Sequence, residues 1–593
     1  MLKKFLYKSL ANFSYFYDYL SYRMYIFLFL SIVVGILDGF GLIMFMPLLE
    51  LVSGSQTKTV GNMGNMSFIV SLLNSVGLEL NLITVLLVML FFFICKGLFQ
   101  FFSEYKKAEY VQLFIRVIRN KLIYCLEKLS FKEFMKTDIG RIQNTLGGEV
   151  SKVTIAFGSY MHVIGHSMMV IVYSTLAFIS NPQFALLVAI GGMMTNLFFK
   201  AIYSQTKELS NKLTDSNHSF QGLLIQNVIF FKYLKATASS TQYSKKLIGN
   251  VSEIEKYSLK IGKLNAIMTG LREPILISVV IAVMIIQARL FNANIALMIL
   301  SILFFYRALN SMMLLQSFWN SYLSVSGSLD NMSKFTAELE SGKQENGSIR
   351  FEVFKNKIQV EQAELSLGNK TILKNVSLEI HKLQSVGFVG ESGSGKTTLM
   401  NVVSGLLQTN KGNVSIDGIN YSDLDIRTLQ RRIGYITQEP VIFTDTIFNN
   451  VTFWDVKTPE NLQRFDLALQ NANIYDFVYE REFLEDSILD NNGINLSGGQ
   501  KQRLSIAREL YKDVDFLFFD EATSALDNES ERLIQENINS LKGKYTLIII
   551  AHRLSTIKNC DQIYYIKSGT IQASGSYEEL LENSSDFKKM AQY

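Results

Sequence analysis

Long apolar runs separated by polar, cation-rich stretches dominate the first 325 residues of the chain. Six runs are long enough to cross a hydrocarbon core of roughly 30 Å. They lie near residues 24–51, 80–104, 154–179, 183–204, 266–290 and 293–322. After about residue 350 the pattern changes to short apolar strands that alternate with helical segments, as in a soluble α/β domain. We therefore expect a six-helix membrane domain over 1–340 and a soluble domain over 341–593.

Lysine and arginine are concentrated in two long polar connections, 105–152 and 205–264, whereas the 52–79 connection contains one cation, Lys58. The positive-inside rule then puts both long connections and both termini in the cytoplasm, with the spans in the inner (cytoplasmic) membrane. Parts of these connections carry apolar residues at helical spacing. We expect membrane helices that continue well below the bilayer and turn there.

Composition narrows the class of protein. Hydrophobic residues make up 48% of the chain and the net charge is +5, which is too modest to argue for a nucleic-acid partner. Three cysteines (Cys95, Cys125 and Cys560) are widely spaced and form no disulfide or metal-ligand pattern. The N-terminus has no small-residue cleavage site after a compact apolar core, so we expect an interfacial helix that leads into the first span.

The soluble half contains a phosphate-binding loop. Nine residues fit the pattern G-x-x-x-x-G-K-[ST] and its extension, namely Gly390, Glu391, Ser392, Gly393, Ser394, Gly395, Lys396, Thr397 and Thr398. A buried strand precedes them and a helical pattern follows, which is the context that the motif requires. Glycines let successive N–H groups surround a polyphosphate. Lys396 would reach the β- and γ-phosphates, and Thr397 would place its hydroxyl on Mg²⁺.

Two further motifs in this half contain residues that could bind the metal, activate water or bind an anion. The apolar run 516–519 ends in Asp520, which would stand on the metal side of the nucleotide, and Glu521, which could polarise the attacking water. The turn Ser497, Gly498, Gly499 and Gln500 precedes a helix that we expect over 501–510. Such a turn is a second anion site at a helix N-terminus, and one nucleotide in one chain does not obviously need two.

These motifs, in this order, resemble those of the ATP-binding cassette (ABC) transporters. The resemblance implies that residues 497–500 of one subunit complete the ATP site of another. It also implies that Gln438 senses Mg²⁺, that Asp527 links the two sites across the dimer, and that His552 contacts the γ-phosphate. Six spans followed by one cassette resemble the exporter half-transporters. The implied fold is an all-α polytopic membrane domain followed by an α/β P-loop NTPase domain.

The chain departs from the family pattern at two positions. Leu367 stands where the family usually stacks an aromatic residue on adenine, so base recognition should be looser. Stacking of an aromatic ring on a base is worth roughly 1–3 kcal/mol in nucleic-acid sites. Asn491 stands where exporters often have a glutamate, so a neutral hydrogen bond would replace an ion pair. Neither change removes a catalytic group.

Ionisable residues within the spans are candidates for the substrate cavity: Asp38, Lys96 and Arg307. A charged group at the centre of a membrane helix costs roughly 2.5–3.5 kcal/mol on insertion scales, so each should face a cavity or a partner. Asp38 could instead pair with a basic residue of another span. His162 and His166 lie one turn apart on the third span, where they would bind a metal, pack, or line the cavity.

We expect ATP-driven export or flipping by alternating access, with ATP and Mg²⁺ as cofactors and an anionic lipid or lipid-linked glycan as substrate. The first span around 35–41 also resembles bacterial flippases of lipid-linked oligosaccharides. Export of a peptide or an amphipathic drug is the alternative, followed by a membrane protein that ATP regulates without transport. Because every catalytic position is intact, two copies of this chain should pair, although a heterodimer stays open.

Overall fold

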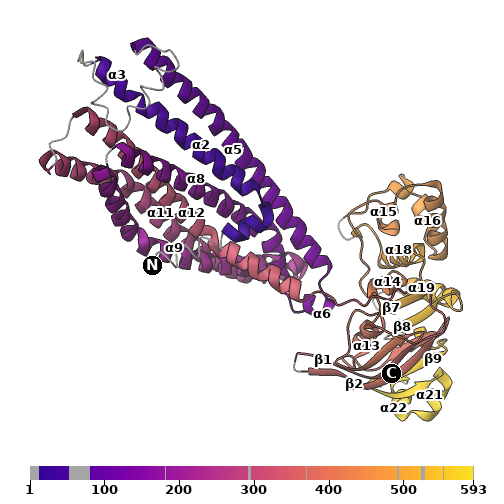
Figure 1. Cartoon of the computed structure of the whole chain (residues 1–593). Helices are drawn as coiled ribbons and strands as arrows, with labels where there is room; N and C mark the ends of the chain where they lie inside the picture. The colour runs from indigo at the N-terminus through magenta and orange to yellow at the C-terminus, as the bar shows by residue number, and fades with distance from the viewer. Residues whose placement is uncertain are drawn as a thin grey trace. The chain divides into compact units, whose positions relative to one another are not determined.

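The computed structural model describes residues 13–52, 81–180, 182–290, 295–368, 370–481, 483–490, 493–522, 528–551 and 553–591. It divides the chain into two compact units, which Figure 1 draws with their helices and strands labelled. The helical unit is Met1–Leu129 with Lys136–Lys343, and the α/β unit is Ser130–Met135 with Gln344–Tyr593.

Very long helices make up the helical unit. Their bounds are α2 (Arg23–Ile43), α3 (Phe45–Val52), α5 (Leu82–Glu127), α7 (Ile139–Asn144), the π-helical turn η2 (Thr145–Glu149), α8 (Val150–Ser180), α9 (Pro182–Ile229), α10 (Phe231–Ala236), α11 (Ser240–Leu290) and α12 (Ile295–Ser341). The 46 residues of α5 extend roughly 69 Å at 1.5 Å per residue, more than twice the thickness of a hydrocarbon core. The expected continuation of membrane helices beyond the bilayer is therefore present in α5.

Three helical segments within the described residues are long and apolar enough to cross a membrane: Arg23–Ile43, Leu82–Glu127 and Ile139–Ile179. They cover the first three expected spans. The other three expected spans fall in α9, α11 and α12, where many side chains lie outside the described part of the chain. Lys58 and most of the 52–79 connection lie outside it as well.

The first apolar run, expected as one span over 24–51, is divided at Met44 into α2 and α3. Proline explains the break, because Pro47 has no N–H to donate to the carbonyl four residues earlier. Pro47 is tolerated in the first turn of α3, where no such donor is needed. In the α/β unit, the helix expected over 501–510 is longer than predicted and runs from Gly498 to Tyr511.

An aromatic cluster joins the N-terminal segment to the core of the helical unit. Residues 13–20 are helical, and Phe16 is completely buried. Its ring lies 5.4 Å from that of Phe114 on α5 and 5.1 Å from that of Phe157 on α8, centroid to centroid. The expected interfacial helix is thus anchored by one buried ring, which fixes its position on α5 and α8.

The α/β unit contains two sheets. Its strands are β1 (Lys357–Leu367), β2 (Lys370–His381), β3 (Ser385–Val389), β4 (Lys411–Ile416), β5 (Ile419–Asn420), β6 (Ile433–Ile436), β7 (Phe516–Asp520), β8 (Thr546–Ile550), β9 (Gln562–Lys567) and β10 (Thr570–Gly575). The first sheet is antiparallel, in the order β2-β1-β4-β5, and the second has the order β10-β9-β3-β8-β7-β6. Strands β9, β3, β8, β7 and β6 are parallel to one another, so their carboxyl ends meet at one edge.

Short and medium helices surround these sheets. They are α6 (Phe131–Phe134), α13 (Lys396–Val403), α14 (Ile426–Gln430), α15 (Ile447–Thr452), α16 (Pro459–Asn471), α17 (Tyr475–Tyr479), the 3₁₀ turn η3 (Leu484–Asp486), α18 (Gly498–Tyr511), α19 (Asn528–Leu541), α20 (Leu554–Ile557), α21 (Tyr577–Asn583) and α22 (Ser585–Ala591). The strands read as continuous apolar runs because the parallel sheet is covered on both faces.

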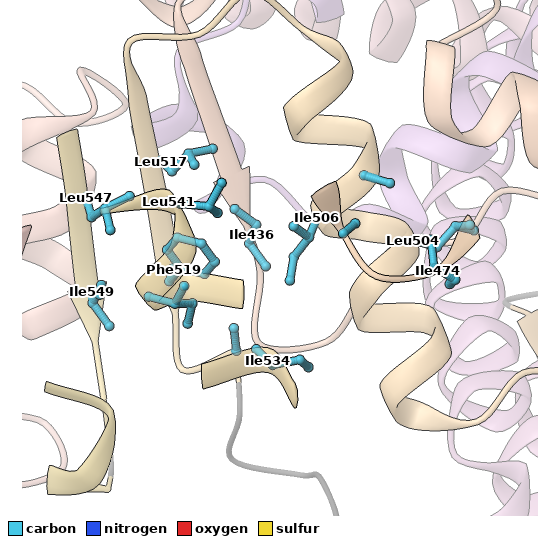
Figure 2. Packing of buried hydrophobic residues seen from close by; sticks show 14 of the residues in the cluster. Ile436, Ile474, Leu504, Ile506, Leu517, Phe519, Ile534, Leu541, Leu547 and Ile549 are labelled. Carbon is cyan, nitrogen blue, oxygen red and sulfur yellow. The ribbon is translucent and has the colours of Figure 1, made fainter. Parts of the chain in front are cut away.

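Two hydrophobic clusters cover the two faces of the parallel sheet. In the first, Leu517 and Phe519 of β7 pack with Leu547 and Ile549 of β8 and with Ile506 of α18, as Figure 2 shows. The second cluster joins α13 to both sheets. Alternate residues of one strand therefore enter different clusters, as the two-residue period of a strand requires.

Helix α6 belongs to the α/β unit although it lies far from the rest of that unit in the sequence. Its Phe131 is partly buried against the second hydrophobic cluster. Ser130 caps the helix by accepting a hydrogen bond from the backbone N–H of Glu133.

Candidate functional site

The phosphate-binding loop connects β3, whose five residues are all buried, to α13. Two of its glycines are required by the backbone. At Gly390, with φ +153°, a Cβ atom would lie 2.0 Å from the carbonyl oxygen of Ile566. Gly395, with φ +107°, is the N-cap residue of α13 and adopts a conformation that side chains disfavour. The loop therefore directs the N-terminus of α13 toward the carboxyl edge of the sheet, as an anion site requires.

Lys396 is the first residue of α13, and 5% of its surface is exposed. Its ammonium donates hydrogen bonds of 3.0 Å to the carbonyl oxygens of Gly390 and Glu391, within the loop itself. Burial lowers the pKa of Lys396, whereas the carboxylates of Glu521 and Asp520 act in the opposite direction. The cation is thus held where the loop would receive a phosphate.

Strand β7 delivers two acids to the same edge of the sheet. Burial, together with the neighbouring Glu521 carboxylate, raises the pKa of Asp520, and hydrogen bonds from Tyr435 and Thr397 oppose that shift. Glu521 has φ +53°, a strained conformation for a residue with a side chain, and its N–H donates to the carbonyl of Ile550 at 3.1 Å. Such strain is often found at functional sites, where the surrounding structure holds it in place.

The donor set at this edge fits Mg²⁺. The hydroxyl of Thr397 lies close enough to the carboxylate of Asp520 to lower its pKa, so two hard oxygen donors already converge. The loop that carries Gln438 begins at the end of β6, the strand next to β7. These three residues would hold the ion, as the sequence predicts.

The Ser497–Gln500 turn caps α18. The hydroxyl of Ser497 accepts from the N–H of Gln500 at 3.2 Å, and the side-chain oxygen of Gln500 accepts from the N–H of Ser497 at 2.9 Å. This reciprocal capping box starts the helix at Gly498, three residues earlier than the sequence suggested. Ser497 and Gly498 are exposed, so the N-terminus of α18 is open to a ligand.

Leu367 is the last residue of β1 and pairs with Lys370 across the turn into β2. It is partly exposed, and its part in base recognition stays a prediction. Three other residues of the expected site, Asn491, Asp527 and His552, lie outside the described residues. The expected roles of these four residues come from the family resemblance alone.

The helical unit contains a cavity of about 350 Å³ that Asp38, Lys96 and Arg307 all line, together with apolar side chains. Asp38 is completely buried and accepts hydrogen bonds from the ammonium of Lys96, at 2.5 Å, and from the hydroxyl of Tyr173. Asp38 and Lys96 therefore neutralise each other, as the alternative interpretation of Asp38 anticipated. Within the described residues, no carboxylate lies within ion-pair distance of Arg307.

The two histidines of α8 also line this cavity. The ring of His162 is stacked on that of Phe318 at a centroid distance of 4.2 Å, and the ring of His166 is stacked on Phe318 at 5.5 Å. Among the described residues no third metal ligand joins them. The packing interpretation of the pair is therefore favoured over metal binding.

The sequence motifs do not predict one polar residue of the nucleotide site, Tyr435. Tyr435 of β6 places its hydroxyl 3.3 Å from a carboxylate oxygen of Asp520. The sequence offered only a weak signal, because a tyrosine within a short apolar strand ordinarily belongs to the core.

Comparisons with known proteins agree with this geometry. The ABC transporter family model matches residues 373–524. The chain is 28% identical over 509 residues, 81% of each chain, to the ATP-dependent lipid A-core flippase of Francisella tularensis subsp. holarctica (strain OSU18). It is 26% identical over 458 residues to the heterocyst differentiation ATP-binding protein HepA of Nostoc sp., covering 77% of this chain and 75% of that protein.

A solved structure shares the fold of nearly the whole chain. A bacterial Atm1-family ABC exporter with ATP bound superposes with a TM-score of 0.78 at 19% identity, covering 96% of this chain and 98% of the other. Residues 373–524 form a domain of the ABC transporter family, and the whole chain has the fold of an ABC exporter. It is a half-transporter, in which a membrane domain is fused to one ATP-binding cassette, and it couples ATP hydrolysis to transport. The class and fold predicted from the motifs are confirmed.

Proposed function

We propose that this exporter flips an anionic lipid or lipid-linked glycan across the inner membrane, with the cassette and both termini in the cytoplasm. The observation that carries the substrate class is the charge of the cavity. Lys96 is neutralised by Asp38, and the other lining carboxylate, Glu104, pairs with Lys107. Arg307 has no carboxylate within ion-pair distance among the described residues. A guanidinium in a membrane cavity needs a counter-charge, and a phosphate group supplies one with matching bidentate geometry. The similarity to a lipid A-core flippase supports the same class.

Two copies of the chain would supply the two ATP sites. The exposed N-terminus of α18 has its own capping box, and it is open for the phosphates of a nucleotide held by the phosphate-binding loop of a second copy. A homodimer is favoured because Lys396, Asp520 and Glu521 are all present in this one chain.

Within such a site the residues have distinct tasks. Lys396 would exchange its two loop carbonyls for phosphate oxygens, and Glu521 would polarise the attacking water. Thr397, Asp520 and Gln438 would hold Mg²⁺, which neutralises charge that develops on the phosphates. Closure of two cassettes on ATP would move the membrane helices into an outward-open conformation, and hydrolysis would return them to the inward-open conformation.

The first test is ATPase activity in lipid nanodiscs with titrated ligands. We expect an anionic lipid or lipid-linked glycan to stimulate the wild type, to have no effect on Glu521→Gln, and to stimulate Arg307→Lys better than Arg307→Met. The lysine variant is the matched control, because it keeps the charge. Stimulation by peptides or amphipathic drugs alone would favour the alternative exporter, and no turnover at all would favour a regulatory protein.

A second test addresses the partner. In a chain whose three cysteines are replaced by serine, Ser392→Cys and Ser497→Cys should cross-link between chains when purified protein is given ATP. If this protein alone gave no cross-link, a different second chain would be required. If cross-linked cassettes still transported substrate, the alternating-access mechanism would be wrong.

A further inference from the structure

The side chain of Tyr435 connects two parts of the nucleotide site that the motifs treat separately. Its hydroxyl lies 3.3 Å from Oδ2 of Asp520 and 3.2 Å from Oδ1 of Asn401, a residue of α13. Helix α13 begins at the phosphate-binding lysine, and β7 ends at the metal-side acid. One phenol therefore contacts both elements that would hold Mg²⁺-ATP.

The register of the sheet explains why the phenol reaches Asp520. Tyr435 of β6 lies opposite Phe518 of β7, and their rings are parallel, with 6.0 Å between centroids and 8° between planes. Side chains two residues apart on a strand point to the same face. Asp520 therefore follows Phe518 on that face, and the hydroxyl at the far end of the Tyr435 ring lies over it.

A phenol has one proton, so it donates to one acceptor at a time. Asp520 is the charged acceptor and makes the stronger hydrogen bond. The amide of Asn401 can satisfy the phenol oxygen from the other side if its nitrogen faces the tyrosine, since the two amide orientations are interchangeable in shape. The hydrogen bond from Tyr435 then restrains the orientation of the Asp520 carboxylate.

The backbone of Tyr435 makes a second connection. Its N–H donates to Oε2 of Glu509, at 3.4 Å, and Glu509 is a buried residue of α18. Helix α18 is the one that begins at the Ser497–Gln500 turn. Three residues beyond Tyr435 the chain reaches Gln438. Tyr435 thus joins the metal-side acid to the signature helix and to the glutamine loop.

We propose that Tyr435 is a positioning residue for the metal–nucleotide complex: it orients the Asp520 carboxylate toward Mg²⁺ and links that carboxylate to the loop of Gln438. The inference rests on the proposed role of Asp520 in holding the ion. Groups that orient metal ligands are often nearly as important as the ligands, and their loss typically costs about 10–100-fold in metal affinity or activity.

The test measures metal-dependent binding of nucleotide without turnover. In the full chain carrying Glu521→Gln, a fluorescent ATP analogue is titrated with Mg²⁺. We expect Tyr435→Phe to raise the Mg²⁺ concentration for half-maximal binding about tenfold. It should leave binding in EDTA and the thermal midpoint unchanged, because the phenylalanine ring still packs on Phe518. Asp520→Asn provides the benchmark and should shift the Mg²⁺ dependence at least as far.

Tyr421→Phe is the matched control. Tyr421 is another tyrosine of the same unit, and its hydroxyl donates to the carbonyl of Val403 at 2.8 Å rather than to a metal-side acid. An unchanged Mg²⁺ dependence in Tyr435→Phe, or an equal shift in Tyr421→Phe, would overturn the inference. A loss of binding in EDTA would show that Tyr435 acts on the fold alone. No effect of Asp520→Asn would overturn the metal-side role of Asp520, which is a failure of the proposed function itself.

Discussion

Oε1 of Glu149 lies 3.0 Å from Nε2 of His218 in the interior of the helical unit, where Glu149 is completely buried. The other carboxylate oxygen accepts a hydrogen bond of 2.6 Å from the amide of Asn331. Glu149 ends the π-helical turn η2, His218 belongs to α9, and Asn331 belongs to α12. One buried carboxylate therefore joins three elements, and a π-helical turn within a longer helix is frequently a functional feature.

Removing the histidine should be costly while the acid remains. We expect His218→Leu to lower the free energy of unfolding by about 1–3 kcal/mol, because it leaves one oxygen of the buried Glu149 carboxylate without the polar ring nitrogen that faces it at 3.0 Å. The same substitution should cost much less in a Glu149→Gln background, where the buried group is neutral. Thermal unfolding in nanodiscs measures both. Equal losses in the two backgrounds would show that the pair contributes packing only.

The pair of Asp38 and Lys96 predicts a similar dependence in the cavity. Lys96→Met should destabilise the protein by about 3–5 kcal/mol, since Tyr173 alone would remain to satisfy the buried Asp38. The double variant Asp38→Asn with Lys96→Met should recover most of that loss. Thermal midpoints of the two single variants and the double variant provide the measurement. Additive losses would mean that the two residues do not interact in the native state.

Replacement of Glu521, the acid that follows β7, should separate nucleotide binding from hydrolysis. We expect Glu521→Gln to lower the ATPase rate by about 10²–10⁴-fold, the usual contribution of a positioned general base, while it retains nucleotide. Glutamine keeps the length of the side chain and the strained backbone at φ +53°. Phosphate release and size measurement with ATP would then show a stable nucleotide-bound dimer. A rate near that of the wild type would assign the water-activating role to another residue.

Cys560 gives a prediction of pH dependence in the α/β unit. Burial raises the pKa of this thiol to about 12, and 8% of the residue is exposed. The reactive species is the thiolate, so iodoacetamide should modify Cys560 very slowly at neutral pH, and the rate should rise as the pH approaches that pKa. In denaturant the rate should already rise near pH 9, because the unfolded thiol has its ordinary pKa. Mass spectrometry of the Cys560 peptide follows both reactions, and equal rates in the two states would contradict the buried environment.

Local patterns predicted much of the α/β unit. The loop from Gly390 to Thr398 and the acids after the apolar run 516–519 could be placed because each motif requires a strand, a turn and a helix in a fixed order. The sequence predicts the start of α18 three residues too late, because Ser497–Gln500 fits a turn before the helix, whereas its capping box already begins the helix.

Partners distant in the sequence could not be predicted in the same way. Asp38 and Lys96 were each recognised as costly groups in a span, but hydropathy alone does not say which helices are neighbours. Tyr435 was not recognised, because its role depends on the register with Phe518 across two parallel strands. Glu149 and His218 lie in polar connections, where a buried contact between an acid and a histidine has no local signature.

The short helix α6 has a practical consequence for work with the nucleotide-binding half alone. Phe131 fills part of the second hydrophobic cluster, yet it enters the chain more than two hundred residues before β1. A recombinant fragment that starts after α12 would therefore expose an apolar notch to solvent and tend to self-associate. Joining residues 130–135 to that fragment through a flexible linker should improve its solubility. A fragment for expression should therefore combine two separate segments of the sequence, 130–135 and 344–593.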